Sequence, residues 1–277
     1  MQHLPQETLI NSPISEPTHL GDFMQELIFL LSGQYAILCQ FAHPSLAKGS
    51  LEHSDFDKRV GARLQNTTTY LIATVFGTME EKEAIFGLIH RLHSRVRGDE
   101  YSADDPELHK WTAVTVLVGW FTVHEVFLGK LPQEKLEHLY QEASIFATSL
   151  RMPATMWPST LEDFWKYWNN NIDNLEITNE ARQLCENLLH PKELPLWMRV
   201  GAPLARLVTI HILPDRLVKE YNLEKSKQAT RIQYRLAVSF IRITYRLVPR
   251  SLKSAMFQRT VKKMQMSAVE IRRKGYW

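Results

Sequence analysis

The stretch from Leu108 to Leu128 is almost wholly apolar, and this feature most limits what the chain can fold into. It includes Trp111, Trp120 and Phe121, so bulky apolar side chains fall on several sides of a helix. A helix that is apolar nearly all round is buried on nearly every side. The stretch therefore predicts a long helix inside the core of the fold.

The rest of the chain also has helical periodicity, and no alternation of apolar and polar residues typical of a strand persists. Expected helices cover residues 22–41, 57–76, 79–96, 133–150, 159–169, 178–189, 225–247 and 251–273. We expect a loop after His43-Pro44, a cap at Ser54-Asp55, and a cap at Asp104 or Asp105 with Pro106 at the first helical position. The prolines at 191, 195 and 203 predict short broken segments. The fold class is therefore all-α, with a single helical domain.

Charge divides the chain unevenly. Residues 225–277 carry 14 Lys and Arg against one acid, Glu270, whereas the remainder has 19 Lys and Arg against 29 acids. We predict an N-terminal polar segment over 1–20, a helical domain over 21–224, and basic C-terminal helices over 225–277 packed on the same domain. The acidic body and the basic end both bear on any partner.

Targeting and membrane signals are weak. The first residues are polar, with Pro5, Pro13 and Pro17, and do not form a signal peptide. The apolar stretch from Leu27 to Ala42 is interrupted by polar residues and is too short for a spanning helix. The sequence therefore predicts a cytoplasmic or peripherally membrane-associated protein without a transmembrane helix.

The basic segment has an arginine stripe at Arg231, Arg235, Arg242 and Arg246. No recognised nucleic-acid-binding motif accompanies it, so we expect no nucleic acid partner. A helix lying on a membrane surface is the better functional interpretation. The interpretation that we favour here is that the helix docks on the acidic body by charge complementarity.

Chemistry must come from residues other than cysteine. The chain has only Cys39 and Cys185, which excludes a disulfide framework and a cysteine-built metal site. It has no nucleophile elbow, no phosphate-binding glycine loop, no zinc-binding His-Glu-x-x-His helix and no paired Glu-x-x-His motifs. The adjacent pairs Glu52-His53 and His124-Glu125 point to different faces of a helix.

The histidines are the first indication of a site. His90 and His93 are three residues apart, so they share roughly one helix face, and Arg97 follows His93 by four residues. A neutral imidazole suits a haem iron or a non-haem metal, and a nearby guanidinium suits an anionic group of the same ligand. The alternative is that both histidines are ordinary residues on a solvated basic face.

A series of short motifs follows in a fixed order along the chain. They are His43-Pro44, Glu52 to Phe56, Phe76-Gly77, Arg91 to Gly98 and Tyr101 to Leu108. In this order they resemble the haem-containing oxygenase family that includes the latex-clearing rubber oxygenases and the fungal endoplasmic-reticulum oxygenase of mycophenolic acid biosynthesis. The resemblance is densest over residues 40–125 and extends from about 20 to 220.

The resemblance implies a helical domain that holds one haem b through a single proximal histidine. The matching histidine is His93, with Arg97 beside it. The distal pattern of the rubber enzymes matches Arg63 and Thr67, whereas Asn66 stands where those enzymes have a lysine. This difference implies an open or water-filled site. Glu52 is the nearest counterpart of the acidic residue that acts as a base, and the fungal membrane helix has no counterpart here.

The residues themselves agree with a haem pocket between core helices. Trp111 and the apolar helix that follows can line a slot together with Leu71 to Phe76, and His90 adds a second imidazole. Arg63 and Thr67, four residues apart, can donate hydrogen bonds to dioxygen or peroxide. The alternatives are that the aromatic residues are core and Arg63 a solvated charge.

We therefore predict a haem b-dependent oxygenase or peroxygenase that oxidises or cleaves a hydrophobic, isoprenoid- or polyketide-like small molecule, with His93 as the metal ligand. Two alternatives remain open. One is a non-catalytic haem carrier or sensor, and the other is a haem-free helical protein that binds a membrane or a partner.

Overall fold

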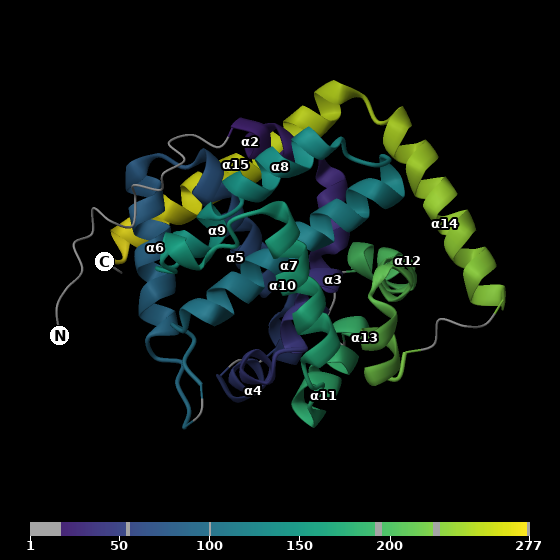
Figure 1. The fold of residues 1–277 in the computed structure, drawn as a ribbon. Coiled ribbons are helices and arrows are strands. Elements are labelled where there is room, and N and C mark those ends of the chain that lie inside the picture. The colour runs from purple at the N-terminus through teal and green to yellow at the C-terminus, as the bar shows by residue number, and fades with distance from the viewer. Residues whose placement is uncertain (1–17, 54–55, 100, 192–195, 224–227, 276–277) are drawn as a thin grey trace.

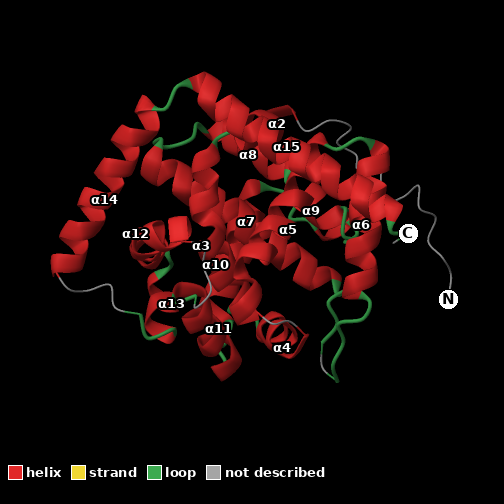
Figure 2. Ribbon diagram, turned by 180° about the vertical axis from the view of Figure 1, so that it is seen from behind, coloured by secondary structure: helices red, strands yellow, loops and turns green. Residues whose placement is uncertain are grey.

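The computed structural model describes residues 18–53, 56–99, 101–191, 196–223 and 228–275. Over these ranges the protein consists of helices and loops (Figure 2), and the sole strand-like pairing is an isolated antiparallel bridge between Arg97 and Ser102. The all-α prediction is confirmed. The caps expected at Ser54-Asp55 and most of the polar segment 1–20 lie outside the described residues.

The helices, in chain order, are α2 (Thr18–Met24), the 3-10 helix η1 (Leu27–Ser32), α3 (Gly33–Phe41), α4 (Pro44–His53), α5 (Phe56–Phe76), α6 (Met79–His93), α7 (Pro106–Phe127), α8 (Gln133–Glu142), α9 (Ile145–Thr148), the 3-10 helix η2 (Ala154–Met156), α10 (Leu161–Asn174), α11 (Asn179–Leu189), α12 (Leu196–Ile212), α13 (Asp215–Glu220), α14 (Gln228–Leu247) and α15 (Arg250–Arg273).

Helix α7 runs through the middle of the molecule (Figure 1) and is buried along most of its length, as its composition predicts. Helices α3 and η1 pack against one side of it, and α9 also contacts it. Asp105 caps its first turn by accepting a hydrogen bond from the Glu107 amide at 2.9 Å, with Pro106 at the first position. The core helix and its predicted start are both confirmed.

Several predicted boundaries are wrong, and backbone chemistry explains them. The helix predicted over 22–41 is divided into α2, η1 and α3, because Glu26 is extended (φ −79°, ψ 107°). The loop predicted after Pro44 is a helix, α4, since a proline that ends one helix can begin the next at its first position. The helix predicted over 79–96 ends at His93, where Ser94 caps it.

Two further segments also differ from expectation. The helix predicted over 133–150 is interrupted between α8 and α9. The proline-rich region expected to be broken contains a continuous helix, α12, with Pro203 inside it. Proline removes one hydrogen bond without always ending a helix, since neighbouring packing can hold the remaining turns.

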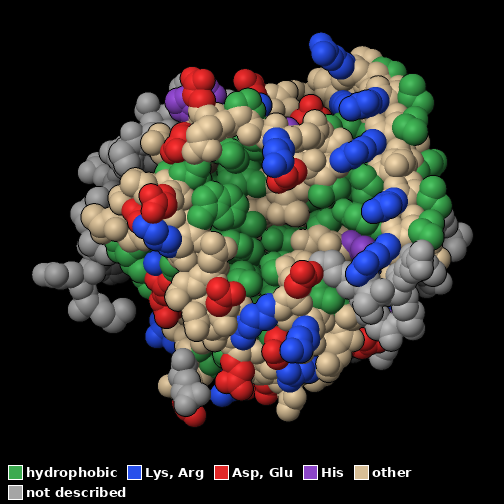
Figure 3. All heavy atoms as spheres, turned by 45° about the vertical axis from the view of Figure 1, so that its right-hand side comes forward, with side chains coloured by type: hydrophobic (Ala, Val, Ile, Leu, Met, Phe, Trp, Pro, Cys, Tyr) green, Lys and Arg blue, Asp and Glu red, His purple; other side chains and the backbone are tan. Residues whose placement is uncertain are grey.

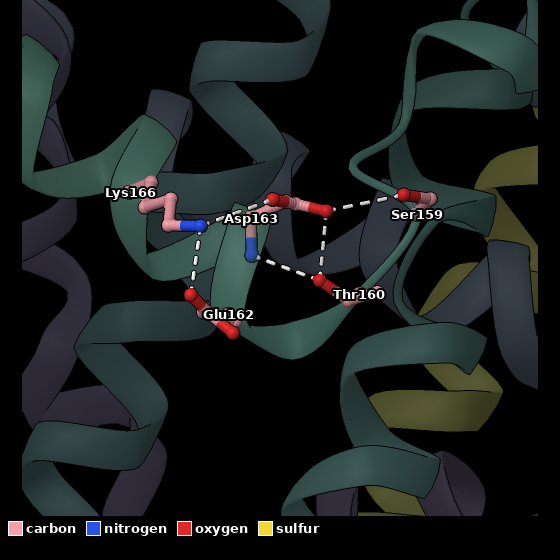
Figure 4. A network of polar contacts seen from close by, with 5 residues as sticks. All are labelled: Ser159, Thr160, Glu162, Asp163 and Lys166. Atoms are coloured by element: carbon pink, nitrogen blue, oxygen red, sulfur yellow. Dashed lines mark hydrogen bonds and ion pairs between the residues drawn. The ribbon is translucent and has the colours of Figure 1, made fainter.

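Helix α10 begins with a network of short polar side chains (Figure 4). Thr160 Oγ1 accepts a hydrogen bond from the Asp163 amide at 3.0 Å, and the Thr160 and Ser159 hydroxyls donate to the Asp163 carboxylate at 2.8 and 3.1 Å. Lys166 pairs with Glu162 at 2.7 Å. The network satisfies amides at the helix N-terminus and fixes where this aromatic helix starts.

The two C-terminal helices cover different parts of the body. Helix α15 packs along α5 and α6 and buries Phe257, Met264 and Ala268. Helix α14 packs on α12 and α7 and lies at the outer edge of the molecule (Figure 1). Ion pairs join this segment to the body, between Lys253 and Glu26 at 3.9 Å and between Arg272 and Glu80.

Among the described helices, none has both the length and the apolarity to cross a bilayer alone. One pair of helices, Leu27–Phe41 and Pro44–His53, has the length and composition of a membrane span when taken together, but the two are bent by 105° relative to each other.

Candidate functional site

His93 is the last residue of α6, and it lies where that helix meets the start of α7. Its Nδ1 atom is buried and has no hydrogen-bond partner among the described residues. The pKa of His93 is lowered to about 4, mainly by burial and in smaller part by the nearby His109, His90 and Arg63, whereas Asp104 opposes them. The imidazole is therefore neutral at pH 7 and has a nitrogen lone pair to offer to a metal.

His109 and Asp104 complete a cluster around His93. One ligand atom from each of the three residues lies within 4.8 Å of the others. His109, in the first turn of α7, is 4% exposed, and its Nε2 lies 2.8 Å from the carbonyl oxygen of Ala103. A hydrogen bond to a carbonyl fixes the proton on Nε2, so Nδ1 carries the lone pair.

The unpaired atoms of the cluster are its most informative feature. His93 Nδ1, Asp104 Oδ1 and His109 Nδ1 are all buried without a hydrogen-bond partner among the described residues. Buried polar atoms are nearly always paired, and exceptions point to a bound water, an ion or a catalytic role. Two imidazoles and a carboxylate form a donor set that suits iron and other transition metals.

His90 lies one turn before His93 but has a different environment. It is buried, and its Nε2 lies 3.2 Å from the carbonyl oxygen of Ser149. Burial lowers its pKa to about 4, and the charge of Arg151 adds to this. The Ser149 hydroxyl in turn meets the Tyr70 hydroxyl at 2.6 Å. His90 therefore links α6 to the segment after α9, while its predicted cofactor role stays a prediction.

Helix α5 brings the predicted distal residues toward the site. The charge of Arg63 contributes to the lowered pKa of His93, and burial lowers the pKa of the Arg63 guanidinium itself. Thr67, one turn further along, is exposed but lines an apolar pocket, and Asn66 is also exposed. Arg63 and Thr67 thus connect the histidine cluster with the pocket along a single helix face.

The pocket is a cavity of about 120 Å³ between α5, η1, α3, α7 and α15. Its lining is mainly apolar and includes Leu64, Leu71, Ile72, Val116, Trp120 and Phe257. The predicted slot between the apolar helix and Leu71 to Phe76 therefore corresponds to a pocket in which both helices take part. His93 is not among its lining residues.

Trp111 does not line this pocket. It is fully buried, its indole stacks on Trp168 with ring centroids 5.4 Å apart, and its Nε1 donates to the Cys39 carbonyl at 3.1 Å. Through these contacts, Trp111 packs α7 against α10 and α3. Its predicted part in cofactor binding stays a prediction.

Arg97 lies in the loop that follows α6, and Glu52 lies in α4, which contacts that loop. Arg97 is exposed and lies beyond the helix end, so the expectation that it lies one helical turn from His93 is wrong. Glu52 accepts a hydrogen bond from the Tyr101 hydroxyl, which also lies 2.9 Å from His53 Nε2. Tyr101 therefore ties this loop to α4.

Asp104 and His109 were not predicted from the sequence as members of the cluster. Asp104 was expected only as a helix cap, and no role was predicted for His109. A signal was present, because His109 is a histidine in the first turn of an otherwise apolar helix. His109 comes close to His93 because of the path of the loop between α6 and α7. The spacing of residues in the sequence does not predict that path.

The all-α domain therefore combines neutral imidazoles and a carboxylate, which can bind a metal, with a pocket that can bind an apolar molecule. The family model described as "ER-bound oxygenase mpaB/B'/Rubber oxygenase, catalytic domain" matches residues 22–243, and the chain belongs to this family. The resemblance expected from the sequence is confirmed. The family defines an oxygenase catalytic domain.

Two curated mycobacterial proteins are similar to the chain. They are the uncharacterized proteins Rv2237 of Mycobacterium tuberculosis and Mb2261 of Mycobacterium bovis, each 28% identical over 223 residues. The match covers 77% of this chain and 87% of each relative. No solved structure gives a significant match.

Proposed function

We propose that this protein is a haem b-dependent oxygenase or peroxygenase that acts on a hydrophobic small molecule, of isoprenoid or polyketide-like character. One observation carries the proposal: His93 is a neutral imidazole whose buried Nδ1 has no partner among the described residues, and it lies near the Arg63 charge. The family match supports the oxygenase class.

The residues fit a haem. His93 would hold the iron, and Asp104 beside it would raise the basicity of the imidazole, as carboxylates near metal-bound histidines do. Arg97, exposed beyond the end of α6, would pair with a haem propionate. When bound, the haem would supply the iron centre for activating dioxygen or peroxide.

The remaining residues bind substrate and oxidant. Arg63 and Thr67 donate hydrogen bonds to the oxidant, and their positions four residues apart let both donors act on one side of α5. The apolar wall of the pocket, including Leu64, Leu71 and Val116, binds the hydrocarbon part of the substrate and excludes water. Glu52 is the candidate base for removing a substrate proton.

A visible spectrum of the purified protein, titrated with haemin, tests the iron ligand. We expect a Soret band that saturates at one haem per chain and that His93→Ala removes. His190→Ala is the control, because His190 is an exposed histidine at the end of α11 that pairs with Glu186 and is not part of the cluster. A wild-type protein without a Soret band, or a band unchanged in His93→Ala, contradicts the proposal.

Oxygen consumption tests the reaction. We expect haem-loaded protein to consume dioxygen, or peroxide, in the presence of members of a terpenoid and polyketide panel, with an oxidised product by mass spectrometry. A haem-loaded protein that turns over no member of this panel supports the carrier or sensor alternative instead.

A second candidate is a non-haem metal centre, favoured by the donor set of His93, Asp104 and His109. Ligands of one ion lie about 3 Å apart, so the three side chains need only small rotations to close on a metal. His109→Ala separates the two candidates. It leaves a haem spectrum in place under the first proposal and abolishes binding of Co²⁺ under the second.

A further inference from the structure

Helix α14 has two different long faces. Its inner face packs on the body, where Ala237 and Val238 are buried and Tyr234 stacks on His211 with ring centroids 4.5 Å apart. Its outer face has large apolar side chains that the body leaves uncovered. These are Ile232, Leu236, Phe240, Ile243 and Leu247, which are 52, 66, 61, 60 and 74% exposed.

The exposed residues form one continuous row. Successive members are three or four positions apart, which places them on the same side of a helix over about four turns. Scattered apolar residues are ordinary on a protein surface, but a contiguous row of this size marks a surface that is covered in use. We call these five residues the outer row of α14.

Arginines border the outer row. Arg231, Arg235, Arg242 and Arg246 lie along one flank of α14, and Figure 3 shows basic side chains lined up beside apolar ones at this edge of the molecule. Arg242 donates to the Val126 carbonyl at 2.7 Å. The other three form no hydrogen bond or ion pair within the part of the chain that the structure describes.

We propose that the outer row of α14 and its arginine flank dock this protein on an anionic lipid surface, an inference that goes beyond the proposed function and does not depend on it. A helix with a large apolar face beside a row of arginines is the type that lies in the plane of a membrane interface. The apolar side chains enter the acyl boundary, and the guanidinium groups contact lipid phosphates.

Charge selects this occupant over a second copy of the same face. Helix α14 contains four arginines and no acidic residue, and Glu270 is the one acidic residue in the whole segment 225–277. Two outer rows packed face to face bring their arginine flanks close together, and like charges there repel. A phosphate-rich surface instead neutralises each arginine.

Vesicle flotation with the full chain tests the proposal. We expect binding to phosphatidylcholine vesicles that contain phosphatidylglycerol, about tenfold or more weaker binding to phosphatidylcholine alone, and a decrease with added salt, because each arginine near an anionic surface contributes about fivefold. Equal binding to both vesicles, or binding to neither, overturns the proposal.

Matched variants assign the binding to the outer row. Leu236→Ser with Phe240→Ser is expected to weaken binding about tenfold or more, since both side chains enter the acyl boundary. Met79→Ser with Leu92→Ser is the control, because these α6 residues are 51 and 50% exposed but lie elsewhere. Arg235→Gln with Arg246→Gln reduces binding only to the anionic vesicles.

Two further readouts decide against other occupants. Circular dichroism should be unchanged in all variants, because the substituted side chains are exposed. Light scattering shows whether the wild-type chain self-associates through the outer row. A dimer that the Leu236→Ser, Phe240→Ser variant dissociates, or equal loss of vesicle binding in the α6 control, overturns the proposal.

Discussion

The rings of His93 and His109 stack with their centroids 5.7 Å apart and their planes inclined by 29°, although one ends α6 and the other lies in the first turn of α7. His109 is the largest charge contribution to the lowered pKa of His93, after the effect of burial. With Asp104 beside them, the pair can act as ligand and support at one metal.

Asp104→Asn is expected to weaken haem binding about ten- to a hundredfold, the range found for partners of metal ligands. The Asp104 carboxylate raises the pKa of His93 and of His109 against the effect of burial. Its removal makes the His93 imidazole a poorer electron donor. Haemin titration and the reduction potential measure the effect, with a more positive potential expected. Asp99→Asn, an exposed change in the same loop, is the control and should alter neither.

Acid should destabilise the haem-free protein between pH 6.5 and 4. Burial lowers the pKa of both His90 and His93 to about 4, so the unfolded chain binds more protons than the folded chain in this window. The free energy of unfolding therefore falls as the pH falls, by on the order of 2 kcal/mol for each histidine.

Urea unfolding at pH 7.5, 6 and 5 measures this slope. His90→Gln removes one titrating group and keeps an amide that can reach the Ser149 carbonyl, so its stability should depend less on pH. A variant with the same slope as the wild type would show that His90 does not contribute.

Arg63→Ala is expected to reduce turnover of the haem-loaded enzyme about a hundredfold, the cost of losing one donor to developing negative charge. In the haem-free protein it should also raise the pKa of His93, because the Arg63 charge lowers it. Arg63→Lys should restore part of the activity. Gln65→Ala, an exposed change on α5, is the control, and Thr67→Val should lower turnover without altering the Soret band.

Gly98→Ala is expected to destabilise the protein by about 1 to 3 kcal/mol, because the added methyl group overlaps the Tyr101 ring, with 2.8 Å left to its Cζ atom. The Tyr101 ring must then move, and the loop that carries Asp104 moves with it. Thermal unfolding and haem affinity should both decrease.

Gly61→Ala is the control for Gly98→Ala, because it is expected to raise the stability of the protein instead of lowering it. No atom lies within 4 Å of a Cβ added at Gly61, in helix α5, so alanine should stabilise the helix by about 0.5 to 1 kcal/mol. If Gly98→Ala is as stable as the wild type, Tyr101 does not hold the loop in place.

The sequence predicted the helical class and the core helix well, because hydrophobic periodicity and the Asp105-Pro106 start depend on local residues. It predicted the ends of helices poorly. Pro44 ends one helix and begins another, and Pro203 ends none, since packing by neighbouring elements decides between these outcomes. Local preferences do not contain that packing.

The candidate site was predicted in part. His93 and Arg63 were found from the sequence, and in the structure the charge of Arg63 lowers the pKa of His93. Asp104 and His109 were missed because their approach to His93 depends on a loop whose course is set by Tyr101, Glu52 and His53. Such long-range contacts have no signature in residue spacing.

The cluster joins two helix ends with different surroundings. His109 belongs to α7, which neighbouring helices surround, whereas His93 is followed by a loop whose contacts to the body include the hydrogen bond between Tyr101 and Glu52. Occupation of the cluster should therefore be visible in hydrogen exchange as slower exchange of amides in residues 94–105, with α7 amides already slow in the unloaded protein. A ligand bound at the cluster should therefore raise the free energy of local opening in this loop, and hydrogen exchange of the loop amides detects the ligand.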